Sequence, residues 1–248
     1  MRRPIVVAGL LASLVPCASN ANDEILKLSK DDNQWVTPAK NYSSTRYSSL
    51  DQINAQNVGK LREAWTFSTG ALRGHEGQPL VVGSTMFVHS AYPNHIYALD
   101  LSKEGAPIKW KYTPKQDDRS VPVACCDLVH RGVNYADGKI LFSTLDGHVI
   151  ALDANTGKEL WNIRNADPGK GETMTMAGLV VKDKYIVGVS GGEFGVRGWV
   201  AAYNINDGKQ VWRAYSMGPD EDIKLAKDFN SANPHYGQFG EGTKTWPG

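Results

Sequence analysis

A tryptophan that recurs at nearly constant spacing is the feature that most limits what this 248-residue chain can fold into. Trp65, Trp110, Trp161 and Trp212 lie 45, 51 and 51 residues apart. In the last two copies an acidic or amide residue precedes the tryptophan by eight residues. A repeat of about fifty residues is typical of proteins that pack several copies of one structural unit side by side.

The clearest copy shows signals of short strands and tight turns. Asp137-Gly138, Asp146-Gly147 and Thr156-Gly157 separate its apolar runs, and Asp-Gly between such runs is a strong hairpin signal. The predicted strands cover 132–135, 139–144, 148–153 and 159–163. Four antiparallel strands in about fifty residues make one blade of a β-propeller. An ordinary β-sandwich would not explain a tryptophan that repeats at the fourth strand.

The number of blades follows from the number of copies. The chain holds three clear copies, and an opening segment around Trp65 resembles the end of an earlier one. No strand pattern is evident in 216–248, which we expect to be a divergent tail. Propellers close rings of about 4–8 blades. The sequence therefore predicts an all-β chain that is either a small four-bladed ring or the N-terminal part of a larger propeller, and the missing closing strand favours the larger one.

The first 21 residues predict a signal peptide. Two arginines near Met1 precede an apolar run from 5 to 15, and small residues lead up to Ala21. This run is too short to anchor the chain in a bilayer, so we expect a mature propeller domain over 22–248. The formal net charge of +1, without a basic block, argues against nucleic acid as a partner. No later stretch is apolar enough for a stable membrane span.

Two adjacent cysteines, Cys125 and Cys126, are the only ones outside the leader. In the oxidising compartment that a signal peptide implies, they have only each other as partners within the chain. A disulfide between neighbours is strained, and strained disulfides are the labile or functional kind. The alternative is a pair of free thiols that pack as small apolar groups. The pair alone leaves both possibilities open.

The unusual stretches of the sequence are expected at one end of the blades. In a four-stranded meander, the connection between strands two and three lies at the same end as the connection to the next blade. The plain Asp-Gly hairpin near 137 and the Thr-Gly turn near 156 fall at the opposite end. Unusual residues gathered at one face predict a binding site there. The stretches that share this end are 74–77, 125–131, 172–175 and 190–197.

Two glutamates lie in these stretches. Glu193, between Gly192 and Gly195, can approach a ligand closely, and its oxygens suit a hard cation such as calcium. For an isolated glutamate, a solvated acid in a glycine loop is the simpler interpretation, and Glu76 alone reads as an exposed turn residue. Histidine pairs at zinc spacing, a C-x-x-C-H haem motif and a G-x-S-x-G elbow are all missing from the sequence.

In combination, these motifs resemble those of the large subunit of pyrroloquinoline quinone-dependent methanol and alcohol dehydrogenases. The likeness runs from about residue 22 to 213, and less closely to 246. The Gly-Gly-Glu-Phe sequence is more similar to the lanthanide-dependent branch than to the calcium branch. The segments that carry the resemblance are Gly74-His75-Glu76-Gly77, Cys125-Cys126-Asp127 with Arg131, Gly171-Glu172-Thr173 with Thr175, and 190–198.

The resemblance implies an eight-bladed periplasmic propeller that binds the quinone in its central mouth. It implies a Cys125–Cys126 disulfide lying flat on one face of the cofactor. It also implies that Glu193 is a ligand of a lanthanide ion or Ca²⁺, which would polarise a quinone carbonyl. The cofactor contacts that it assigns are Glu76, Cys125, Cys126, Arg131, Thr175, Ser190, Gly191 and Gly192.

The implied activity is oxidation of methanol or another small primary alcohol, with electrons passing to a soluble cytochrome c. The resemblance also implies a homodimer at full length. In the family the catalytic aspartate and the remaining metal ligands come after the position of residue 248, so we expect this chain alone to be inactive. A sugar or larger-alcohol dehydrogenase of the same superfamily is a further possibility. The alternative class is a non-enzymatic scaffold of outer-membrane assembly, which shares the tryptophan repeats but has no need of adjacent cysteines.

Overall fold

The computed structural model describes residues 21–217 and residue 222. The predicted signal peptide, apart from Ala21, and nearly all of the predicted tail lie outside these residues. The chain opens with a short helix, α1 (Asp23–Leu28). Asn22 caps this helix, since its side-chain oxygen accepts a hydrogen bond from the backbone N–H of Ile25 at 3.1 Å. No helix within the described ranges is both long and apolar enough to cross a bilayer.

Three four-stranded antiparallel sheets follow, each a simple meander. The first contains β1 (Leu80–Val82), β2 (Thr85–His89), β3 (Ile96–Asp100) and β4 (Ile108–Tyr112). The second contains β5 (Asn134–Ala136), β6 (Lys139–Ser143), β7 (His148–Asp153) and β8 (Glu159–Arg164). The third contains β9 (Leu179–Val181), β10 (Lys184–Gly188), β11 (Trp199–Asn204) and β12 (Gln210–Tyr215). The predicted blades are confirmed, and the strand bounds predicted for the second blade differ from these by no more than two residues.

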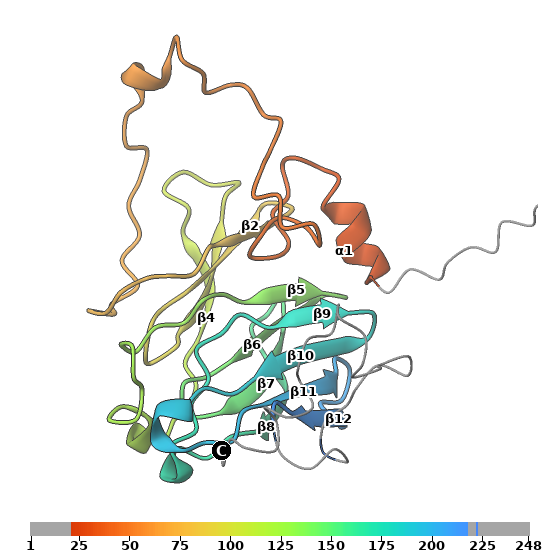
Figure 1. Ribbon diagram of the computed structural model, residues 1–248. Coiled ribbons are helices and arrows are strands. Elements are labelled where there is room, and N and C mark those ends of the chain that lie inside the picture. Colours follow the sequence, from red (N-terminus) through yellow and green to blue (C-terminus); the bar gives the residue numbers. More distant parts are fainter. Residues whose placement is uncertain (1–20, 218–221, 223–248) are drawn as a thin grey trace, which may run out of the picture.

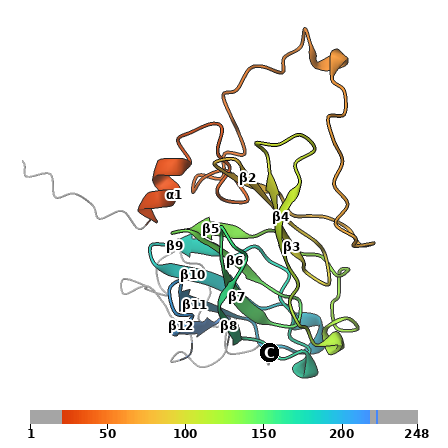
Figure 2. The same ribbon diagram turned by 180° about the vertical axis from the view of Figure 1, so that it is seen from behind.

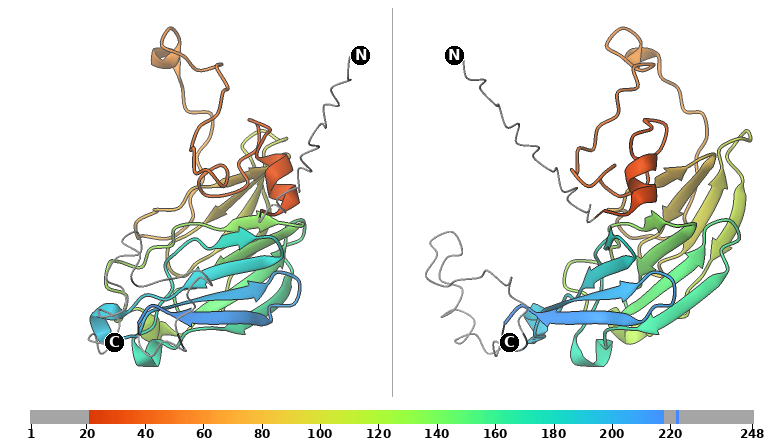
Figure 3. Two further views of the ribbon diagram at one scale, coloured as in Figure 1. Left: turned by 45° about the vertical axis from the view of Figure 1, so that its right-hand side comes forward. Right: turned by 90° about the vertical axis from the view of Figure 1, so that its right-hand side faces the viewer.

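The sheets stack face to face like a partly opened fan, with β5 beside β9 (Figures 1 and 3). The view from behind shows the first sheet next to β6 and β7 (Figure 2). One apolar cluster, which includes Phe87 and Phe142, fills the space between the first and second sheets. A second cluster, which includes Leu141 and Tyr185, fills the space between the second and third. The core is therefore a series of interfaces between blades.

The repeated tryptophan occupies the same place in each sheet. It lies on the fourth strand, opposite an alanine of the third strand, and the strand register shifts directly after that alanine. Such a bulge bends the strand locally, and the small partner leaves room for the indole. The pairs are Trp110 with Ala98, Trp161 with Ala151, and Trp212 with Ala202.

Two of these indoles bind the blade that follows in sequence. The Nε1–H of Trp110 donates to the carbonyl oxygen of Ala154 at 3.1 Å, and that of Trp161 donates to Ile205 at 3.0 Å. The turn beneath Trp110 has Gly157 at φ +71°, and a Cβ there would lie 2.6 Å from the indole. The glycine of this Thr-Gly turn thus allows the tight hairpin and also leaves room for the indole of the preceding blade.

The predicted earlier copy around Trp65 is not a blade in this structure. The segment between α1 and β1, orange in Figure 1, makes a long excursion without a strand, interrupted by the turn η1 (Val58–Lys60). Trp65 is 37% exposed. The bridge of this segment to the first sheet, Trp35 with Val81 of β1, lies well before Trp65. Among the described residues no strand pairs with the part around Trp65, so its apolar pattern has no ladder to join. The described part of the chain therefore contains three blades.

Candidate functional site

A cavity of about 270 Å³ lies where the loops before β5 and β9 meet the loop between β10 and β11. Seven of the eight predicted cofactor contacts line this cavity, together with Glu193. Three of the four unusual stretches in the sequence therefore do come together at one end of the blades. The lining residues are Cys125, Cys126, Asp127, Val129, Arg131, Thr173, Thr175, Ser190, Gly191, Gly192 and Glu193.

Glu76, the eighth predicted contact, does not line the cavity but pairs with Arg131, which does. Its carboxylate oxygen Oε2 is 3.1 Å from Nε of Arg131. Arg131 also donates from Nη1 to the hydroxyl of Thr175 at 2.8 Å, and its backbone N–H donates to the Thr175 carbonyl at 3.0 Å. Arg131 is thus held from two sides, with its guanidinium at the cavity. Residues 74–77, the fourth unusual stretch, therefore reach the site through the ion pair of Glu76 with Arg131.

The loop between β10 and β11 depends on a glycine conformation. Gly191 has φ +127°, and its carbonyl oxygen accepts hydrogen bonds from Phe194 at 2.8 Å and Val196 at 3.1 Å. The short turn η4 (Gly192–Phe194) that results leaves Glu193 exposed. Two backbone hydrogen bonds between Ser190 and Thr173 fasten the start of the loop to the neighbouring stretch. The sequence Ser-Gly-Gly-Glu-Phe therefore builds a carboxylate-bearing loop at the cavity.

The two cysteines are free and exposed thiols in the structure, so the predicted disulfide is not formed here and stays a prediction. Sγ of Cys125 donates to Oε1 of Glu193 at 3.5 Å. A hydrogen bond with Cys126, together with desolvation and the Glu193 carboxylate, raises the pKa of Cys125 from about 9 to about 11. In the dithiol form, the Cys125 thiol is therefore a hydrogen-bond donor to Glu193, the carboxylate predicted to bind the metal ion.

We expect reduced Cys125 to alkylate slowly below pH 9. Because only the thiolate reacts, a pKa of about 11 instead of about 9 predicts a reaction with iodoacetamide roughly 100-fold slower than that of an unperturbed thiol at pH 8. The rate should keep rising up to about pH 11. The measurement is the pH dependence of alkylation of Cys125, read from peptide masses, with N-acetylcysteine as the reference. A rate that levels off near pH 9 would contradict the raised pKa.

Three lining residues were not predicted as contacts: Asp127, Val129 and Thr173. Side chains alternate along an extended segment, so Val129 shares a side with Arg131, and Thr173 shares one with Thr175. This two-residue period is visible in the sequence and could have identified Val129 and Thr173, whereas Asp127 lies at a turn. Asp127 also has φ +72°, which is unusual for a residue other than glycine.

Two buried histidines, His89 and His130, lie next to Arg131. His89 donates from Nε2 to the carbonyl oxygen of His130 at 3.0 Å, and His130 donates from Nε2 to Ser143 at 2.7 Å. Burial lowers the pKa of His89 to about 4 and that of His130 to about 3. Both rings are therefore neutral at ordinary pH. They fix the backbone beside Arg131 without adding charge to the cavity.

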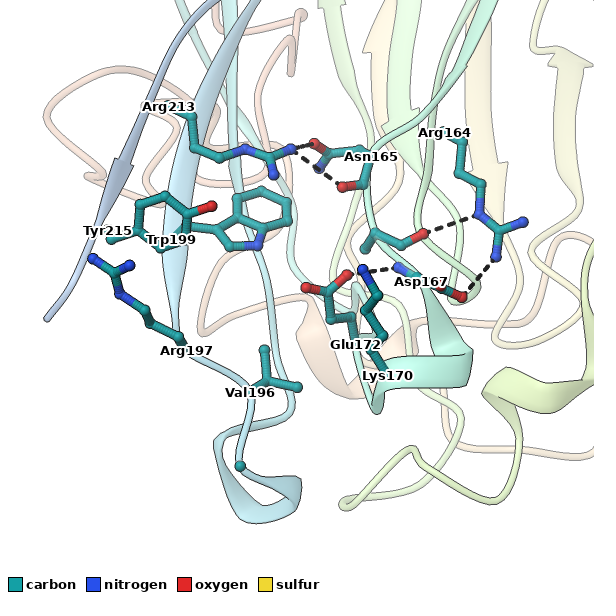
Figure 4. A pocket seen from close by; sticks show the side chains of 12 residues that line it. Arg164, Asn165, Asp167, Lys170, Glu172, Val196, Arg197, Trp199, Arg213 and Tyr215 are labelled. Atoms are coloured by element: carbon teal, nitrogen blue, oxygen red, sulfur yellow. Dashed lines mark hydrogen bonds and ion pairs between the residues drawn. The ribbon is translucent and has the colours of Figure 1, made fainter. Parts of the chain in front are cut away.

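A larger cavity of about 550 Å³ lies nearby, between the second and third blades. None of the predicted site residues lines it. Figure 4 shows Arg213 reaching Asn165 across this space and Arg164 bonded to Asp167. Arg197, on the same side, pairs with Asp222 at 2.9 Å and lies over the Tyr215 ring. Each of these three arginines binds a protein group, although Nη2 of Arg197 and Nε of Arg213 have no hydrogen-bond partner among the described residues. Because the contacts around this cavity join the residues after Glu193 to the second blade, we interpret this region as structural support for the Glu193 loop.

The residues of the smaller cavity fit a polar quinone better than they fit an isolated metal ion. Arg131 and the hydroxyls of Thr173, Thr175 and Ser190 can donate to carboxylate and carbonyl oxygens. Within the described residues, no group of three His, Cys, Asp or Glu side chains could hold a metal ion. Glu193 therefore offers one ligand to a cation, and further ligands would have to come from a bound cofactor or from other residues.

Known proteins match this chain closely. It is 64% identical over 240 residues to a lanthanide-dependent methanol dehydrogenase of Methylacidiphilum fumariolicum (strain SolV), covering 97% of this chain and 39% of that protein. It is 53% identical over 253 residues to methanol dehydrogenase [cytochrome c] subunit 1 of Methylobacterium organophilum, covering 98% and 40%. The chain thus spans about two fifths of the length of these relatives.

The structure also resembles a solved one. The europium-containing methanol dehydrogenase superposes with a TM-score of 0.87 at 66% sequence identity, over 92% of this chain and 39% of that chain. Residues 35–239 match the family described as PQQ: glucose/ethanol/alcohol dehydrogenase, β-propeller domain. PQQ is pyrroloquinoline quinone. With the repeated blades and this match, the chain belongs to the β-propeller family of PQQ-dependent glucose, ethanol and alcohol dehydrogenases.

Proposed function

We propose that this chain forms the part of a periplasmic quinoprotein alcohol dehydrogenase that binds pyrroloquinoline quinone. The observation that carries the proposal is the meeting of seven predicted cofactor contacts and Glu193 at one cavity, from three stretches far apart in the sequence. A scaffold without a cofactor would have no need of this donor set. The names of the relatives, methanol dehydrogenases, support methanol or another small primary alcohol as the substrate.

Each of the eight predicted cofactor contacts has a role in this proposal. Arg131 and Thr175, already hydrogen-bonded to each other, would hold carboxylate or carbonyl oxygens of the quinone. Ser190 and Gly191 would contact it, with Gly192 lining the same wall. Cys125 and Cys126, joined as a disulfide, would lie against one face of its rings. Glu76 would act through Arg131, whose guanidinium it orients.

Glu193 would be a ligand of the metal ion. When bound, the quinone accepts the hydride of an alcohol, and the cation polarises a quinone carbonyl as a Lewis acid. Relatives described as lanthanide-dependent and europium-containing support a lanthanide over Ca²⁺. We assign no catalytic residue to this chain. A soluble cytochrome c as electron acceptor is supported by the name of a second relative, and a homodimer remains part of the proposal.

The test is a titration of the purified chain with pyrroloquinoline quinone, followed by quenching of tryptophan fluorescence, with and without La³⁺. We expect saturable quenching that La³⁺ strengthens. Glu193→Gln should weaken the La³⁺ effect at least about tenfold, because it removes the charged ligand that the proposal assigns to the metal ion. Glu104→Gln, an exposed acid outside the cavity lining, should leave it unchanged. Absence of saturable quenching in the wild-type chain would overturn the proposed function.

The disulfide can be tested separately. Protein purified from the periplasm without reductant should resist alkylation at both Cys125 and Cys126, and its mass should be lower by two hydrogens than after reduction. Alkylation of both residues before any reductant is added would show that the thiols are free, as they are in the structure.

A further inference from the structure

Residues 70–77, here called the strap, run along the rim of the cavity just before β1 and carry Glu76. Most of the strap is exposed, and Leu72 is fully so. At its end, Gly77 presses against the protein, since a Cβ there would lie 1.9 Å from the His89 ring and 3.1 Å from the Arg131 carbonyl carbon. At the other end, the carbonyl oxygen of Thr69, the residue before the strap, accepts a hydrogen bond from the Tyr97 hydroxyl at 2.7 Å. The exposed part between these two ends needs further contacts to hold one position.

Two ion pairs connect the strap to the cavity wall, and the strap supplies the cation in one and the anion in the other. Arg73 of the strap has Nη1 3.6 Å from Oδ1 of Asp127, and Glu76 of the strap has Oε2 3.1 Å from Nε of Arg131. The strap therefore presents a cation and then an anion, while the wall presents an anion and then a cation. Reversed or shifted placement would bring like charges together, so the pattern specifies one register of the strap.

Asp127 is built to receive Arg73. Its φ of +72° turns the backbone sharply after Cys126, and its Oδ1 accepts a hydrogen bond from the backbone N–H of Leu128 at 2.8 Å. That bond fixes the carboxylate at the cavity wall. Gly74 brings the strap backbone close, since a Cβ there would be 3.9 Å from the other oxygen of Asp127.

We propose that Arg73 and Asp127 are positioning residues that hold the strap closed along the cavity and so keep Glu76 in reach of Arg131. The importance of that position for quinone binding rests on the proposed function. The ion pair itself does not, and it can be tested on the unliganded chain.

Trypsin provides the test, because it must take the Arg73 side chain into its own pocket and so competes directly with Asp127. Asp127→Asn keeps the shape of the side chain and tolerates the positive φ, but it removes the charge. Exposed ion pairs contribute about 0.2–1 kcal/mol, so we expect cleavage after Arg73 to become about 1.4- to fivefold faster at low salt. Glu76→Gln should act in the same direction by releasing the second ion pair.

Salt dependence and a matched variant distinguish faster cleavage after Arg73 from a general destabilisation of the chain. At high salt the exposed pair is screened, so cleavage of the wild type should approach that of Asp127→Asn. Asp207→Asn breaks a comparable exposed pair with Lys209, 3.0 Å apart in another hairpin, and should change cleavage after Lys209 but not after Arg73. Equal rates after Arg73 in the wild type and Asp127→Asn at low salt would overturn the proposal. Failure of quinone binding would count against the proposed function alone.

Discussion

Replacing Gly191 with alanine is expected to abolish quinone binding and to destabilise the chain by about 2–5 kcal/mol. At φ +127° an alanine is strained, and its Cβ would lie 2.2 Å from the carbonyl oxygen of Gly171 and 2.8 Å from the side chain of Val196. Backbone atoms cannot move away as a flexible side chain can. The loop that presents Glu193 would therefore lose its conformation.

The neighbouring glycine is a matched control. Gly192 has no atom within 4 Å of a Cβ position, so Gly192→Ala should change stability by no more than about 0.5 kcal/mol. Denaturant unfolding gives the stability, and the fluorescence titration gives quinone affinity. Equal stability of Gly191→Ala and Gly192→Ala would show that the loop adapts, and the account of the Glu193 loop would then be wrong.

Replacing Trp161 with alanine should cost about 3–5 kcal/mol. Trp161 is 9% exposed, and its indole packs between the second and third blades and donates to the Ile205 carbonyl at 3.0 Å. Alanine would leave a cavity in that interface and a carbonyl without its donor. Trp161→Phe, which keeps a ring but loses the hydrogen bond, should cost less.

Trp212 provides the comparison within the repeat. It stands opposite Ala202 as Trp161 stands opposite Ala151, but it is only half-buried, and among the described residues its Nε1–H has no hydrogen-bond partner. Trp212→Ala in this chain should therefore cost less than half as much as Trp161→Ala. Equal losses of unfolding free energy, measured in denaturant, would show that the interface between blades is not the source of the effect.

The fold was predictable where local chemistry and the repeat agreed. Asp-Gly turns between apolar runs predicted the second blade almost to the residue, and the repeat extended that prediction to the other two. The segment around Trp65 shows the limit. It carries the motif of a fourth strand, but a strand needs partners for its backbone hydrogen bonds, and a motif does not reveal whether partners exist.

The site was predictable to the level of stretches. The parity of strand connections predicted that 74–77, 125–131, 172–175 and 190–197 would meet. The last three line one cavity, and 74–77 joins it only through the ion pair of Glu76 with Arg131. The resemblance added roles to individual residues, which stay predictions. The ion pair of Arg73 with Asp127 and the hydrogen bond of Cys125 with Glu193 could not be predicted from the sequence. Both depend on distances between loops, and the sequence has no periodicity that relates those loops.

Trp110 and Trp161 each reach forward along the chain, to a carbonyl 44 residues later, and this direction has a consequence for synthesis. A blade emerges from the ribosome before the residues that cover its outer strand exist. At about 5–20 residues per second, the indole waits roughly 2–9 s for its partner. Throughout that time the newest blade exposes an aromatic ring and an unpaired strand edge, features that invite aggregation. The youngest blade, rather than any fixed position, is therefore where a nascent propeller most needs a chaperone.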